Sequence, residues 1–338
     1  MTVSYSVLDL APVVEGSAPT VSFENSVQLA QLAESLGYRR YWLAEHHNMP
    51  GIASAATSVL LCHIGDNTST IRIGSGGIML PNHSPLVIAE QFGTLATLFG
   101  DRIDLGLGRA PGTDQVTMRA LRRQPQQAVD SFPQDVLELQ HYFDDPSRTI
   151  NAVPGQGLHV PLWLLGSSLY SAQLAAQMGL PFAFAAHFAP DMLLQALRIY
   201  REQFKPSAQC PTPYTMLCVN LIAADNTRQA EYLFTSLQQQ FLQLYRGTPG
   251  KIPLPRQPLT GYESFEINAM ERTLSRSLVG SPNRIRAGIE ALLEETQVNE
   301  LMFNGPITDP TARLESFGIG AQVMQDINAG VHTSEMAK

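Results

Sequence analysis

Four of the eight histidines stand in polar segments that follow runs of apolar residues. His46 and His47 come after one such run, and His83 and His187 come after two later ones. Histidine exchanges a proton readily near neutral pH, so this placement suits general acid–base chemistry. A single histidine is more often a hydrogen-bonded structural residue, but the four together favour a functional site. We predict that His46, His47 and His83 are catalytic and that His187 lines their pocket.

A second group of residues has the chemistry of an anion site. Gly166, Ser167 and Ser168 end an apolar run and open a helical one. Free backbone N–H groups, the helix dipole and serine hydroxyls attract a phosphate at such a position. Arg109 adds a charge that can pair with the same phosphate. The residues alone leave two alternatives open, namely Ser168 as an ordinary helix cap and Arg109 as the ion-pair partner of Asp104.

The elements that must position these residues alternate between apolar and helical runs. The apolar runs predict eight strands, at Ser4–Leu8, Tyr38–Leu43, Ile71–Ser75, Ile103–Leu107, Leu162–Leu165, Phe182–Ala185, Tyr214–Ala223 and Glu300–Asn304. Each is followed by a helical pattern, and eight βα units close a parallel barrel. The strands are apolar on both faces, as helix-covered parallel strands are. The fold class is therefore α/β, a (β/α)8 TIM barrel with an insertion before the last βα unit; an open doubly wound sheet is the alternative.

The insertion is Arg246–Thr273, which is rich in proline and glycine and breaks the alternation. So long an irregular stretch in a compact domain is usually a functional lid or a disordered loop. After it, Leu274–Thr296 predicts a helix with a break at 280–282. We predict one domain over 1–330, a mobile active-site insertion at 246–273 and a C-terminal tail at 331–338.

Residues that follow the strands of such a barrel meet at one rim, where the active site of the fold lies. Besides the residues above, this rule places four others there: Asp9, Glu45, Gly76 and Gly77. Asn82 lies beside His83 in the same connection. Neighbouring side chains in a strand point to opposite faces, so His46 and His47 are not expected to coordinate the same metal ion. We therefore predict no metal site.

Composition limits the classes of partner. The chain has 30 acidic and 22 basic residues and a net charge of −8, which disfavours binding to nucleic acid or to an anionic membrane. Its three cysteines lack CxxC spacing, so neither a disulfide framework nor a zinc site is predicted. No signal peptide and no apolar run of about 20 residues is found. These features predict a soluble cytoplasmic protein.

Longer motifs around these residues resemble the bacterial luciferase family of flavin-dependent monooxygenases. The resemblance covers essentially the whole chain and rests on five segments: Trp42–Asn48, Ile73–Pro85, Gly100–Gly112, Leu164–Phe188 and Leu278–Pro282. Within the family, the sequence looks closer to a subgroup of bacterial oxidoreductases than to the light-emitting subunits.

The resemblance implies a cofactor and places it. The cofactor is FMN, bound in its reduced form and supplied by a separate NAD(P)H-dependent flavin reductase. Gly76 and Gly77 are expected beside the isoalloxazine ring, where family members often have a non-prolyl cis peptide. The residues expected around the phosphate are Arg109, Ser167, Ser168 and Ser171. The pocket around the ring is expected to include Asp9, Glu45, Asn82 and His187.

The implied reaction joins reduced FMN and O2 in a C4a-hydroperoxyflavin that oxygenates a small organic substrate, with His46 as the acid or base near C4a. The resemblance also implies a homodimer. Three alternatives stay open: hydride transfer from the deazaflavin F420 in the same fold, a flavin-binding protein without turnover, and a metal-dependent barrel hydrolase built on His46, His47 and His83.

Overall fold

The structure, a computed structural model, describes residues 2–110, 115–121, 131–144 and 149–336. The strands are β1 (Ser4–Asp9), β2 (Arg40–Leu43), β3 (Arg72–Met79), β4 (Ile103–Gly108), β5 (Leu162–Gly166), β6 (Phe182–Ala185), β7 (Thr215–Ala223), β8 (Leu278–Gly280) and β9 (Glu300–Asn304). The α-helices are α1 (Pro19–Ser35), α2 (Thr57–Asp66), α3 (Pro85–Phe99), α4 (Gln115–Ala120), α6 (Phe132–Asp144), α7 (Leu169–Met178), α8 (Leu193–Gln203), α9 (Thr227–Tyr245), α10 (Ser264–Thr273), α11 (Pro282–Thr296) and α12 (Pro310–Met336).

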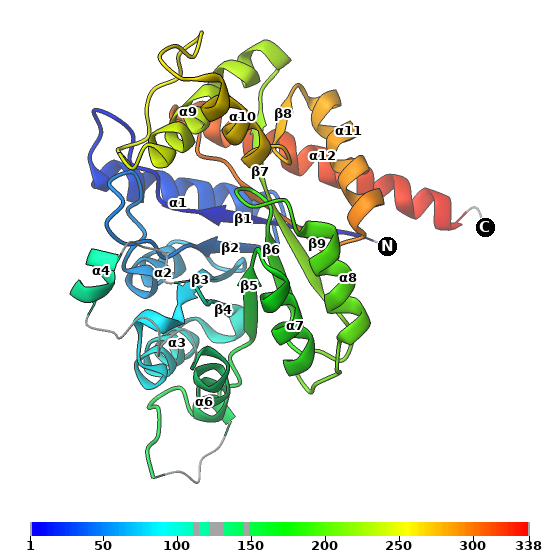
Figure 1. Cartoon of the computed structure of the whole chain (residues 1–338). Coiled ribbons are helices and arrows are strands. Elements are labelled where there is room, and N and C mark those ends of the chain that lie inside the picture. Colours follow the sequence, from blue (N-terminus) through cyan, green and yellow to red (C-terminus); the bar gives the residue numbers. More distant parts are fainter. Residues whose placement is uncertain (1, 111–114, 122–130, 145–148, 337–338) are drawn as a thin grey trace.

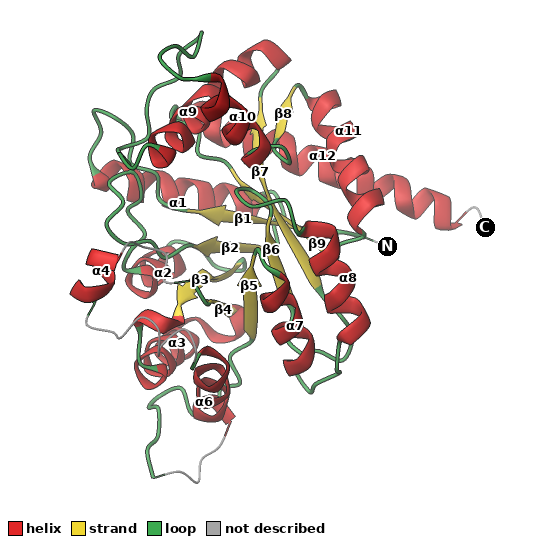
Figure 2. Cartoon of the chain, in the orientation of Figure 1, coloured by secondary structure: helices red, strands yellow, loops and turns green. Residues whose placement is uncertain are grey.

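Eight parallel strands close into a barrel. Their order is β6-β5-β4-β3-β2-β1-β9-β7, and a pairing of β6 with β7 joins the two ends. Helices lie around the outside of the sheet (Figures 1 and 2). The TIM-barrel prediction is confirmed, and the doubly wound alternative is wrong because an open sheet would leave β6 and β7 at its edges.

The period of two along each strand divides the side chains between two cores. Trp42 and Leu8 point into the barrel, where they pack with Trp163 and residues of β6, β7 and β9. Their neighbours Tyr41 and Val7 belong to the larger core between barrel and helices. Successive strand residues face opposite sides, so parity decides which chemistry-bearing residues can reach the barrel interior.

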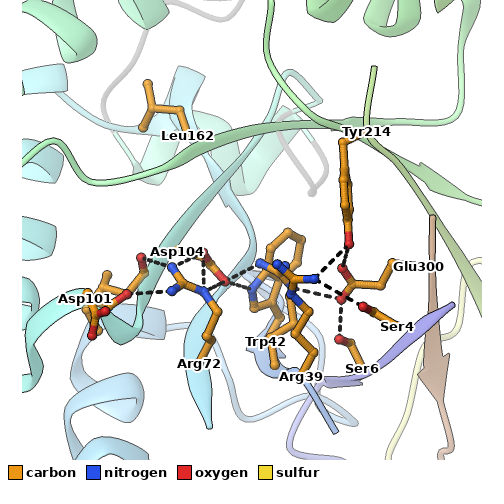
Figure 3. A network of polar contacts seen from close by, with 12 residues as sticks. Ser4, Ser6, Arg39, Trp42, Arg72, Asp101, Asp104, Leu162, Tyr214 and Glu300 are labelled. Atoms are coloured by element: carbon orange, nitrogen blue, oxygen red, sulfur yellow. Dashed lines mark hydrogen bonds and ion pairs between the residues drawn. The ribbon is translucent and has the colours of Figure 1, made fainter. Parts of the chain in front are cut away.

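Charged residues fill the amino-terminal end of the barrel (Figure 3). Arg40 lies 2.6 Å from Asp104 and 2.8 Å from Glu300, and all three side chains are at most 3% exposed. Arg72 also binds Asp104, at 2.7 Å. The predicted alternative of an Arg109–Asp104 ion pair is therefore wrong, because other arginines occupy this carboxylate and Arg109 follows the opposite end of β4.

Several predicted boundaries change. Leu278–Gly280 is a short strand that pairs with the end of β7, where the sequence indicated helix. The 246–273 insertion contains the helix α10. Reciprocal hydrogen bonds of Glu263 and Glu266 form a capping box at the amino terminus of this helix. Residues 331–336 continue α12 and do not form a separate tail. In the part of the chain that the structure describes, no helix has both the length and the apolar character needed to cross a bilayer.

Candidate functional site

The carboxyl ends of the strands carry a buried carboxylate with two histidines around it. Glu45 Oε1 lies 2.6 Å from Nε2 of His47 and 2.8 Å from Nε2 of His83. Glu45 is 1% exposed, whereas the two imidazoles are 18% and 27% exposed. His47 and Glu45 come from the loop after β2, and His83 comes from the connection after β3. The tertiary structure thus joins two predicted catalytic residues through a predicted pocket residue.

Backbone contacts with β3 hold this carboxylate in place. The Met79 N–H donates to Glu45 Oε2 at 2.9 Å, and the Glu45 N–H donates to the Gly77 carbonyl at 3.2 Å. Burial raises the pKa of Glu45, but hydrogen bonds from His47 and His83, the charge of His83 and the Met79 amide together lower it to about 2. Glu45 is therefore ionised at neutral pH.

The other two rim histidines form a different environment. Burial and the nearby charge of His46 lower the pKa of His187 to about 3, against the opposing effect of a backbone hydrogen bond with Cys218. The Nδ1 atom of His187 is buried and has no hydrogen-bond partner among the described residues. The ring packs edge-on against Phe188, with 4.7 Å between the centroids. His187 is therefore a neutral ring at physiological pH.

Sequence reasoning missed the amides that fix the backbone of His187. Asn220 Nδ2 donates to the His187 carbonyl at 2.7 Å and to Ser277 Oγ at 3.0 Å. Asn304 Nδ2 donates to Asn220 Oδ1 at 2.9 Å. Both asparagines are buried in strands that otherwise read as apolar, and such interruptions are the signal that would have found them.

Residues of the predicted anion site come together where β4 ends and α7 begins. Arg109 follows β4, and its guanidinium carbon lies 4.1 Å from the ring centroid of Tyr170 in the first turn of α7. Ser168 is the N-cap of that helix and accepts the Ser171 N–H at 3.4 Å. Ser167 precedes them and is half-buried. A cation, two hydroxyls and a helix amino terminus thus lie together, which is the donor set that suits a phosphate.

The predicted glycines have packing roles. A Cβ at Gly166 would lie 2.2 Å from Ser171 Oγ, so this glycine allows the serine to approach and is not simply a gap for a ligand. A Cβ at Gly77 would lie 2.7 Å from the Gly106 carbonyl, and one at Gly76 would lie 2.7 Å from Leu8. Gly76 and Gly77 lie inside β3, not after it, and the peptide between them is cis, as the resemblance implies.

The structure gives less support to a place in the pocket for Asp9 and Asn82 than for Glu45 and His187. Asp9 faces the helices because β1 continues through it, and its carboxylate accepts Arg313 Nη2 and Ser26 Oγ, both at 2.6 Å, besides the Tyr41 hydroxyl. These partners occupy Asp9, so we do not include it in the proposed site. Asn82 ends the short turn Leu80–Asn82 and is buried; its role stays a prediction.

Among the described residues, Glu45, His47 and His83 are also the one group of three or more histidine, cysteine or acidic residues whose ligand atoms all lie within 4.8 Å of one another. The metal alternative was built on His46, His47 and His83, whereas Glu45 takes the place of His46 in the observed group. Two imidazole nitrogens and the Met79 amide already surround this carboxylate, so its charge is compensated by hydrogen bonds.

Comparison with known proteins places the chain. The family model described as luciferase-like monooxygenase matches residues 3–300. A protein of Escherichia coli (strain K12) with that same name is 58% identical over 329 residues, which are 96% of this chain and 98% of that protein. The crystal structure of apo-MsnO8 has a TM-score of 0.85 and 33% identity, and covers 96% of this chain and 98% of that one.

Two further solved structures share the fold at lower identity. The oxygenating constituent of 3,6-diketocamphane monooxygenase from Pseudomonas putida, solved with FMN, has a TM-score of 0.73 at 16% identity, covering 96% of this chain and 98% of that one. An F420-dependent secondary alcohol dehydrogenase, solved with an F420–acetone adduct, has a TM-score of 0.70 at 14% identity with the same coverage.

These two likenesses show the fold alone. The match over residues 3–300 and the 58% identity over nearly the full length go further. The chain belongs to the luciferase-like monooxygenase family.

Proposed function

We propose that this protein is an FMN-dependent monooxygenase that uses reduced flavin and O2 to oxygenate a small organic substrate. The observation that carries the proposal is the anion site at α7, where Arg109 lies against Tyr170 beside Ser168 and Ser171. FMN and riboflavin differ by one phosphate, so a phosphate-binding donor set favours FMN among simple flavins. Membership of the monooxygenase family supports the same reading.

When bound, reduced FMN supplies the electrons that activate O2. The chain supplies the binding and the protons. Arg109 and the amino terminus of α7 hold the phosphate, and the inward-facing apolar residues around Trp42 exclude water from the barrel. His47 and His83 exchange protons at the rim, and the neutral ring of His187 offers a hydrogen bond without a charge.

The insertion at 246–273 is proposed to close over the rim. Ile252 exchanges backbone hydrogen bonds with Val13 and Glu15 in the loop after β1, at 2.8 and 2.9 Å. Lys251 Nζ donates to the Ser17 carbonyl at 2.7 Å. In Figure 1 this yellow loop lies beside the blue loop that follows β1. Opening these few bonds is a local change that leaves the barrel intact.

The resemblance to flavin-dependent monooxygenases also implies partners for the reaction. We propose that a separate NAD(P)H-dependent reductase delivers reduced FMN and that the protein works as a homodimer in the cytoplasm. Sedimentation of the purified protein tests the dimer. Addition of NAD(P)H to the protein with oxidised FMN tests the reductase: the flavin should stay oxidised until a reductase is added.

The decisive experiment is anaerobic. The protein is mixed with reduced FMN and then with oxygenated buffer, and the absorbance of oxidised flavin is followed. We expect its return to be delayed by at least tenfold relative to free reduced FMN, because the site holds the flavin away from water. The same titration with F420 tests the alternative. Binding of F420 with no binding of FMN would replace oxygenation by hydride transfer, and binding of neither would contradict both.

A further inference from the structure

Two asparagines lie at the same level on neighbouring strands at the carboxyl end of the barrel. Asn220 of β7 pairs in register with Asn304, the last residue of β9. Each lies two residues after a side chain that packs inside the barrel, Cys218 in β7 and Met302 in β9. Because side chains alternate along a strand, both amides face the barrel interior. The two residues are 1% and 7% exposed.

Hydrogen bonds fix which way both amide groups point. A backbone carbonyl accepts and does not donate, so the atom of Asn220 that lies 2.7 Å from the His187 carbonyl oxygen must be the NH2 nitrogen. The oxygen of Asn220 then lies 2.9 Å from Asn304 and requires a donor, which is the NH2 group of Asn304. If either amide were reversed, two acceptors would face each other. The His187 carbonyl therefore orients Asn304 through Asn220.

This orientation leaves the oxygen of Asn304 for a group that the chain does not supply. Among the described residues, Asn304 Oδ1 has no hydrogen-bond partner. A polar atom in so buried a residue costs free energy when it stays unpaired, and native proteins leave few such atoms unmatched. The residue is still 7% exposed, so a molecule in the site can reach it. We therefore expect the missing donor on a bound ligand.

The contacts behind this oxygen restrict the group that it can bind. Asn220 and Asn304 are neutral amides, and their other partners are the His187 carbonyl and the Ser277 hydroxyl, which carry no charge. An amide oxygen attracts an N–H or O–H group and repels a carbonyl, ether or carboxylate oxygen. A buried cation would need an opposite charge, which these groups do not provide. The matching ligand group is a neutral donor.

We propose that Asn304 Oδ1 is a binding subsite for a neutral N–H or O–H donor of the bound flavin or of the organic substrate, with Asn220 as the positioning residue that orients it. Two sources can supply this donor. Reduced FMN has ring N–H groups at N3 and N5, whereas an alcohol or amide substrate has a donor of its own. The flavin source rests on the proposed function, but the substrate source can be tested without flavin.

Anaerobic titrations followed by flavin absorbance test the flavin source. Reduced FMN is compared with its N3-methylated analogue and with reduced deaza-FMN, in which carbon replaces N5. Asn304→Leu removes the oxygen and nearly keeps the shape of the side chain. Reduced FMN should bind this variant roughly 3- to 10-fold more weakly than the unmodified protein, the effect of one neutral hydrogen bond. The analogue that lacks the donor concerned should bind both proteins equally.

Benzyl alcohol and its isomer anisole test the substrate source without flavin. The alcohol has an O–H donor, whereas the ether oxygen of anisole only accepts. For a substrate donor, the unmodified protein should bind benzyl alcohol roughly 3- to 10-fold more tightly than anisole, as followed by tryptophan fluorescence. Asn304→Leu should abolish this preference.

The matched control is Asn299→Leu, just before the other end of the same strand. There Asn299 Oδ1 accepts the Thr215 N–H at 2.8 Å. This variant removes an amide of the same size from the amino-terminal end of the barrel. It should leave the affinities for all five probes unchanged.

One measurement needs no variant. A crystal structure of the unmodified protein with FMN or benzyl alcohol should place an N–H or O–H group within hydrogen-bond distance of Asn304 Oδ1. Ligands that present only carbonyl oxygen or carbon there would overturn the proposal, as would unchanged affinities for every probe in Asn304→Leu. If FMN does not bind the unmodified protein, the proposed function falls, while the preference for benzyl alcohol decides whether the subsite exists.

Discussion

The two ends of the barrel compensate buried carboxylates with different partners. At the amino-terminal end, Asp104 and Glu300 are paired with Arg40 at 2.6 and 2.8 Å. At the carboxyl end, Glu45 is held by His47 and His83 at 2.6 and 2.8 Å. The distances are alike, but a guanidinium does not release its proton in a protein, whereas an imidazole does so near neutral pH.

The difference assigns the two ends to different tasks. At the centre of the network in Figure 3, the side chains of Arg40, Asp104 and Glu300 are at most 3% exposed and the charge of the guanidinium is permanent, so we expect these three residues to contribute to stability. The two imidazoles of the histidine cluster are 18% and 27% exposed, and imidazole is a group that can exchange a proton, so we propose that this cluster takes part in proton exchange. This division follows the general rule for the fold, in which loops at the carboxyl end carry the chemistry and the other end carries stability.

Breaking the arginine network should have the largest effect on folding. Arg40→Met removes a buried cation and leaves Glu300 without one. We expect a loss of about 3–5 kcal/mol in the free energy of unfolding, measured with urea, because breaking a buried ion pair leaves one buried charge without a partner. Arg39→Met is the matched control, since Arg39 is exposed and should cost less than about 1 kcal/mol. Equal losses would show that burial does not set the difference.

Removing the charge of Glu45 should alter how stability depends on pH. Folding lowers the pKa of Glu45 from 4.5 to about 2. A lowered carboxyl pKa contributes stability that is present above the unfolded value and lost as the pH falls through the folded value. The unmodified protein should therefore exceed Glu45→Gln by about 3 kcal/mol above pH 5 or so, and the gap should close toward pH 2.

Unfolding titrations at a series of pH values measure this gap. Glu24→Gln, an exposed position on α1, is the control and should give a small difference that does not vary with pH. A gap between the unmodified protein and Glu45→Gln that stays constant from pH 6 to the acid limit would contradict the role of the ionised carboxylate.

Loss of the cation at the anion site should weaken flavin binding with little effect on folding. Arg109→Met should reduce the affinity for FMN by roughly 10- to 100-fold, the effect of losing a hydrogen bond to a charged group. Riboflavin lacks the phosphate, so its affinity should change by less than about threefold. Fluorescence titration of both flavins measures the contrast. Equal losses for FMN and riboflavin would place Arg109 away from the phosphate.

The smallest effect is expected in the insertion. Lys251→Met removes a hydrogen bond to the loop after β1 and should cost about 1 kcal/mol or less globally. Amide hydrogen exchange over residues 246–263 should nevertheless accelerate several-fold, because local opening needs less energy than unfolding. Lys205→Met, at an exposed position two residues after α8, is the control. Unchanged exchange in the insertion would argue against Lys251 as a latch for a lid.

Much of the fold could be predicted because its signals are local. The helices Pro85–Phe99 and Thr227–Tyr245 begin and end where their apolar spacing, prolines and caps indicate. The eight barrel strands are also found near their predicted positions. Boundaries failed where pairing decided them: β3 continues through Gly76 and Gly77 because β4 bonds to it there, and β8 exists only because β7 extends far enough to pair with it.

The sequence alone determined the architecture of this protein and the end of the barrel at which His46, His47, His83 and His187 lie. Those properties depend on short-range periodicity and on the order of elements. Only the tertiary structure decided that Glu45 forms hydrogen bonds with both His47 and His83. The same holds for the ion pair of Asp9 with Arg313 and for the contact of Arg109 with Tyr170 in α7. Such choices depend on strand parity and register, which neighbouring strands impose on one another and no local pattern encodes.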